Sequence, residues 1–295
     1  MNKISLLIVA AFSAFALSSC GGGKEAEEME TADTVKVEEP KNPVSETFFQ
    51  VPSPGEMLTF IKMVGGDGNK KTSFLNPTAN EKNYSDLKAK SLNFGIYSCD
   101  LSYCSIFEIG SESLKYFKTV KQMGDQIGVS TAIKPEVLKR LEKNISNSDS
   151  LAVITDDVYF SSFSALEDSK QGPTLALVVA GGWLESVYIA TNLAKYEANS
   201  PVIERLADQK YTLENLLEFL KKHEADPSVM AVKTDFEALL AEFNKIGEKE
   251  AKPLKNPEKG ATQLGGGTQL VITEAVYKAI ADKIGSLRNS YTLTK

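Results

Sequence analysis

Two long stretches of this chain are apolar on every side of a predicted helix. In residues 84–108, apolar side chains recur three and four positions apart on both sides of the helix, as Leu92 and Ile96 do on one side and Phe94 and Tyr97 on the other. Residues 172–196 contain a similar apolar run, with a single acid between Leu175 and Ala190. A helix that is apolar all round has no face for water, so it lies in the centre of a domain. We expect two core helices here, and the second is not expected to span a membrane.

The spacing of apolar residues elsewhere, with Ser, Asn, Pro and Gly near the expected ends, predicts further helices. The predicted helices cover residues 53–64, 84–108, 111–127, 134–145, 151–166, 172–196, 200–208, 212–224, 227–246 and 273–290. No segment alternates convincingly at period two. We therefore predict an all-α fold, as one multi-helix bundle of about ten helices or as two stacked or duplicated helical units. A flexible loop is expected at residues 65–83 and a flexible linker at 250–268.

Each central stretch carries glycine, then an acid, then a tyrosine three residues after the acid. Asp100 and Tyr103 align with Glu185 and Tyr188 at a shift of 85 residues, which is consistent with an internal duplication. Gly95, Gly181 and Gly182 weaken a helix, so their presence predicts that another backbone or a ligand comes close.

Both acids lie among apolar neighbours, and a buried carboxylate costs several kcal/mol unless it is hydrogen-bonded or paired. Three interpretations stay open. Each acid accepts a tyrosine hydroxyl or pairs with a lysine or one of three arginines (Arg140, Arg205 and Arg288). Alternatively, the two helices line a ligand pocket, formed by Tyr97, Asp100, Tyr103, Trp183, Glu185 and Tyr188. In the third, the paired carboxylates catalyse hydrolysis, which needs both in one solvent-accessible cleft, about 5–9.5 Å apart for a glycoside.

Other site chemistry finds little support in the sequence. Cys99 and Cys104 lie five residues apart in one predicted helix, beyond disulfide reach, and are expected to be buried small residues. His223 is the single histidine and is expected to be a solvated cation at a helix C-terminus, so no metal or cofactor is predicted. Residues 21–50 hold eight acids and three lysines, so most of the chain's net charge of −6 lies there and the folded part is close to neutral. Nucleic acids bind to a basic face, so they are not expected as partners.

The N-terminus indicates where the protein is sent. A positive start, an apolar run from Ile4 to Leu17 and the sequence Leu17-Ser18-Ser19-Cys20 resemble the signal peptide and lipobox of bacterial lipoproteins. The resemblance implies a signal peptide at residues 1–19 and lipidation of Cys20, which makes the lipid bilayer a partner. Residues 20–50 are then a lipidated, disordered acidic tether and residues 51–295 the globular domain.

Two further resemblances concern the source and the role. The acidic sequence Lys24-Glu25-Ala26-Glu27-Glu28 looks like the export signal of surface lipoproteins in Bacteroidota, so outer-membrane attachment is expected, with the surface and periplasmic faces both open. Residues 92–103 and 180–190 resemble uncharacterised all-helical lipoproteins of the same group. We expect a non-enzymatic domain that binds a small molecule or scaffolds an envelope protein. The alternative is a hydrolase that uses Asp100 and Glu185.

Overall fold

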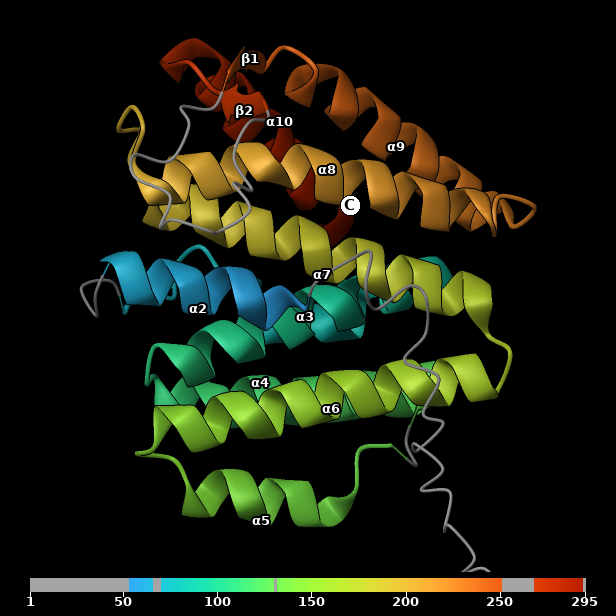
Figure 1. The fold of residues 1–295 in the computed structure, drawn as a ribbon. Coiled ribbons are helices and arrows are strands. Elements are labelled where there is room, and N and C mark those ends of the chain that lie inside the picture. The colour runs from blue at the N-terminus through green and yellow to red at the C-terminus, as the bar shows by residue number, and fades with distance from the viewer. Residues whose placement is uncertain (1–52, 66–69, 130–131, 251–267, 294–295) are drawn as a thin grey trace, which may run out of the picture. The chain divides into compact units, whose positions relative to one another are not determined.

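A computed structural model describes residues 53–65, 70–129, 132–250 and 268–293 of the chain, all within one compact unit. The predicted signal peptide, Cys20 and the tether lie outside the described residues. The described part confirms the all-α prediction (Figure 1). Its helices are α2 (Pro54–Gly65), the 3-10 helix η1 (Thr78–Asn83), α3 (Leu87–Ile106), α4 (Gly110–Ile127), α5 (Pro135–Lys143), α6 (Ser148–Asp168), α7 (Gly172–Leu193), α8 (Pro201–Lys221), α9 (Pro227–Phe243) and α10 (Glu274–Thr292).

The central pair is α3 and α7, as the sequence predicts. Every residue of α3 from Ser91 to Ile106 is buried, and so are most residues of α7. The two helices pack directly on each other along much of their length. In Figure 1, α4, α5 and α6 lie on one side of this pair and α8 and α9 on the other.

Glycines let the backbones of α3 and α7 touch. A methyl group built on Gly95 would lie 2.0 Å from the carbonyl oxygen of Val178, and one on Gly181 would lie 2.0 Å from that of Leu92. Such distances are far below an ordinary contact, so no side chain fits at either position. The prediction that a backbone or a ligand comes close is therefore confirmed for Gly95 and Gly181, where the neighbour is a backbone, whereas the atom nearest to a methyl group on Gly182 is the side-chain Cγ of Pro54 at 3.1 Å.

Helix α7 is long and apolar enough to cross a membrane by length and composition alone. However, 89% of its most apolar window is buried inside the folded part. It packs against α3, α2, α8 and α10, which agrees with the prediction of a core helix.

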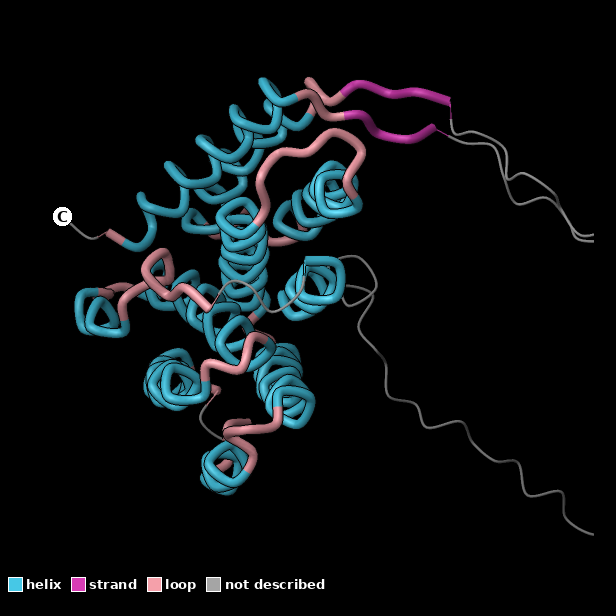
Figure 2. Tube along the Cα trace, turned by 90° about the vertical axis from the view of Figure 1, so that its left-hand side faces the viewer, coloured by secondary structure: helices cyan, strands magenta, loops and turns pink. Residues whose placement is uncertain are grey.

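Three details differ from the predictions. The helices predicted at 200–208 and 212–224 are one continuous helix, α8. Gln209, which lies between the two predicted helices, is buried and accepts a hydrogen bond from Trp183, so the buried face of α8 runs on through this position. A two-stranded antiparallel hairpin, β1 (Gly247–Glu250) with β2 (Thr268–Val271), flanks the predicted linker (Figure 2).

The third difference lies in the predicted loop at 65–83. Its glycine-rich portion, 66–69, is outside the described residues, but the rest is ordered and packed. Leu75 and Asn76 are buried, and η1 follows directly after Pro77. The sequence predicts a flexible loop here, whereas the side chain of Asn76 is hydrogen-bonded to the core.

Candidate functional site

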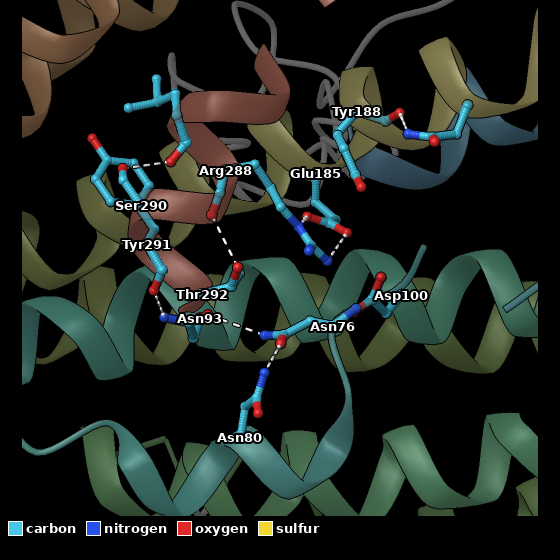
Figure 3. Close-up of polar contacts among 12 residues, drawn as sticks. Asn76, Asn80, Asn93, Asp100, Glu185, Tyr188, Arg288, Ser290, Tyr291 and Thr292 are labelled. Carbon is cyan, nitrogen blue, oxygen red and sulfur yellow. Dashed lines mark hydrogen bonds and ion pairs between the residues drawn. The ribbon is translucent and has the colours of Figure 1, made fainter. Parts of the chain in front are cut away.

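The buried acids meet a cation from the last helix. Asp100 of α3 and Glu185 of α7 are both 0% exposed, and Arg288 of α10 is 5% exposed. The Arg288 guanidinium donates from Nε to Oε2 of Glu185 at 2.9 Å and from Nη2 to Oε1 at 2.9 Å (Figure 3). The guanidinium also lies over the Tyr188 ring, 4.6 Å from its centroid. This bidentate pair compensates the burial of both charges.

Asp100 is held differently from Glu185. Its Oδ2 accepts a hydrogen bond from the backbone N–H of Asn76 at 3.2 Å. Its Oδ1 is buried and receives no hydrogen bond from a donor among the described residues. Burial raises the pKa of Asp100 well above its usual range, and the charge of Glu185 raises it further, while Arg288 partly opposes them. A group in this position favours its neutral form.

Asn76 is the residue that the sequence analysis missed. Its amide donates to Tyr84 Oη at 2.9 Å and to Asn93 Oδ1 at 3.2 Å, and its Oδ1 accepts from Asn80. Its backbone N–H donates to Asp100, and its backbone carbonyl accepts from Tyr116 Oη at 3.0 Å. The signal that could have found it is the Asn76-Pro77 step, which favours a tight turn beside the core.

The same network holds the last helix against the central pair. Asn93 Nδ2 donates to the backbone carbonyl of Tyr291 at 2.9 Å (Figure 3). Tyr84 Oη donates to the backbone carbonyl of Thr292 at 3.1 Å. Together with Arg288, these bonds tie the end of α10 to α3 and α7.

The structure brings together only part of the predicted ligand pocket. Asp100, Glu185 and Tyr188 gather around Arg288. Tyr97 and Tyr103 donate instead to backbone carbonyls, those of Pro77 and Lys71, each at 2.9 Å. Trp183 donates its indole N–H to Gln209 of α8 at 3.1 Å. Of the partners expected for a structural role, an arginine is found for Glu185, and a backbone N–H serves Asp100 in place of a tyrosine hydroxyl.

The carboxylates have no route to solvent in this conformation, because both are fully buried. Four surface pockets lie elsewhere, and none of their lining residues belongs to the predicted set. The most enclosed of them holds about 160 Å³ between residues 196–204 and 270–273. The arrangement around Arg288 can therefore neutralise charge and position helices, and among the described residues neither carboxylate is exposed to a substrate.

The remaining candidates for chemistry are also packed. Cys99 and Cys104 are free and buried, as predicted, and burial raises the pKa of both thiols. The prediction of a solvated cation at His223 is wrong, because its ring packs edge-on against Phe219 and over Gly172. Partial burial, with the nearby Lys222, lowers the pKa of His223. Among the described residues, no group of three or more His, Cys, Asp or Glu side chains could hold a metal ion.

Comparisons with known proteins give no relative. No protein-family model matches the chain, no curated protein matches it, and no solved structure matches it. The resemblance to bacterial lipoproteins therefore stays a prediction from the N-terminal sequence.

Proposed function

We propose that the chain is a lipid-anchored envelope protein whose helical domain is a non-enzymatic scaffold for another envelope protein. The acyl chains on Cys20 hold it at the outer membrane, and residues 21–50 separate the domain from the lipid.

The observation that supports a scaffold is the complete burial of Asp100 and Glu185. A hydrolase needs a carboxylate that reaches substrate and water, and a ligand-binding protein needs a concave pocket with a few convergent polar groups. The Glu185–Arg288 pair instead satisfies itself inside the core. Scaffolding is the function that requires neither an accessible acid nor a pocket at this position.

The anchor is tested by metabolic labelling with a palmitate analogue. We expect the wild-type chain to incorporate the label and to fractionate with membranes, and Cys20→Ala to lose both properties. Cys104→Ala is the matched control, because this cysteine is buried in α3 and should leave labelling unchanged. Undiminished labelling of Cys20→Ala would contradict the proposed anchor.

The scaffold role is tested by native mass spectrometry of the protein purified from its own envelope. We expect a stoichiometric complex with another protein. A mass increase of a few hundred daltons, retained by the isolated chain, would contradict the scaffold and favour capture of a small ligand. Hydrolysis of an envelope substrate that Asp100→Asn and Glu185→Gln abolish without unfolding would favour the hydrolase instead.

A further inference from the structure

The buried centre holds one more acid than it has cations. Among the described residues, two buried carboxyl groups, those of Asp100 and Glu185, face a single buried guanidinium, that of Arg288. If both acids were ionised, the centre would carry an uncompensated negative charge, which costs several kcal/mol in a protein interior. We propose that Asp100 binds a proton in the folded protein at neutral pH and donates it in a hydrogen bond to Glu185.

The hydrogen bonds identify which acid carries the proton. Both oxygens of Glu185 accept from the Arg288 guanidinium, so this carboxylate keeps its charge. Asp100 accepts one bond, from the N–H of Asn76 to Oδ2, and its Oδ1 receives no donor from the described residues. A protonated Asp100 supplies a donor to Glu185 and leaves its other oxygen for Asn76. The centre then carries no net charge.

In the part of the chain that the structure describes, Arg288 is the one cation that acts on the pKa of Asp100. Its charged neighbours are Glu185 from α7 and Arg288 from α10. The other titratable neighbours are neutral phenols and thiols: Tyr84 before α3, Tyr97, Cys99 and Cys104 within α3, and Tyr116 of α4. Helix α6 contributes Tyr159, which lies near Cys99. Lys62 of α2 donates to the backbone carbonyl of Ile106 and pairs with Glu108, beyond the end of α3.

Infrared spectroscopy detects this proton directly. The full chain, labelled with carboxyl-¹³C aspartate, should show the carbonyl stretch of a protonated carboxylic acid, shifted by the isotope. The spectrum should be recorded at about pH 8, because burial raises the pKa of Asp156 to about 6 and this second aspartate must be ionised. Asp100→Asn should remove the band, and the exposed acid variant Asp157→Asn should keep it. Absence of an isotope-sensitive acid band from the wild type would overturn the proposal, and this result does not depend on any variant folding.

Denaturant unfolding at a series of pH values gives a second readout. Asn resembles protonated Asp100, since its oxygen accepts from Asn76 and its amide donates to Glu185. The unfolded aspartate loses its proton near pH 3.9 and the folded one does not. The ratio of the wild-type to the Asp100→Asn unfolding constant should therefore rise about tenfold per pH unit above about pH 4. A ratio that stays constant between pH 5 and about 7, as expected for Asp282→Asn at an exposed position of α10, would overturn the proposal.

Discussion

Replacing Gly181 by alanine tests whether the contact between α3 and α7 depends on a missing side chain. The added Cβ would lie 2.0 Å from the carbonyl oxygen of Leu92 and 2.8 Å from its carbon. An ordinary contact begins near 3.4 Å, so the helices must separate by roughly 1.4 Å at this point. Backbone atoms cannot rotate away as the end of a flexible side chain can, so the strain spreads along both helices.

The expected loss follows from two opposing effects. Overpacking a core costs about 1–3 kcal/mol, and more where the backbone must move. Alanine returns about 1 kcal/mol as a better helix former than glycine. Because the backbone overlap here is severe, the cost should exceed the gain, and we expect Gly181→Ala to lower the free energy of unfolding by about 1–3 kcal/mol.

Urea unfolding followed by circular dichroism measures this change, and α10 supplies the matched control. Gly285 lies inside that helix, and the nearest atom to its built Cβ is Tyr188 Cε2 at 3.8 Å, an ordinary contact. Gly285→Ala should therefore stabilise the protein by up to about 1 kcal/mol. If Gly181→Ala proved as stable as the wild type, the proposed backbone contact would be refuted.

Two further predictions concern the groups around the core. Asn76→Ala should lower the free energy of unfolding by at least about 2 kcal/mol, because it removes the donor to two buried oxygens, Tyr84 Oη and Asn93 Oδ1. Urea unfolding measures this loss, and Asn192→Ala at an exposed helix end is the control. Equal losses from both variants would contradict the role of Asn76. Asp156 packs against Gly55, and burial, with Glu56 and Asp157 nearby, raises its pKa to about 6. Its folded pKa exceeds the unfolded value of about 3.9, so the wild type should lose stability relative to Asp156→Asn as pH rises from about 4 to about 6, then stay level. A stability difference that does not change over that range would count against this burial.

The sequence patterns were enough to predict the helical class and the central pair, because helices that are apolar on all sides, as α3 and α7 are, lie in the core of a domain. The glycines likewise predicted the close approach of the two backbones. Arg288 could be named only as one of three arginines, since 103 residues separate it from Glu185 and no local pattern links them. Asn76 was missed because three of its five hydrogen bonds join it to residues at least 17 positions away in the sequence, namely Asn93, Asp100 and Tyr116.

The continuity of α8 and the hairpin have a similar explanation. The predicted helices left a break at residues 209–211, and only the hydrogen bond from Trp183 shows why Gln209 is buried within a continuous helix. The strands of the hairpin are four residues each, too short for alternation to distinguish them from a loop.

Glu185 and Arg288 form a structural ion pair between buried side chains in the core. The most direct test compares the unfolding free energies of Glu185→Met, Arg288→Met and the double variant. Arg288→Met leaves a buried carboxylate unpaired and should cost about 3–5 kcal/mol, whereas replacing both charges by apolar groups is often nearly neutral. We predict that the double variant is more stable than Arg288→Met alone. A double variant that loses the sum of the two single losses would contradict the claim.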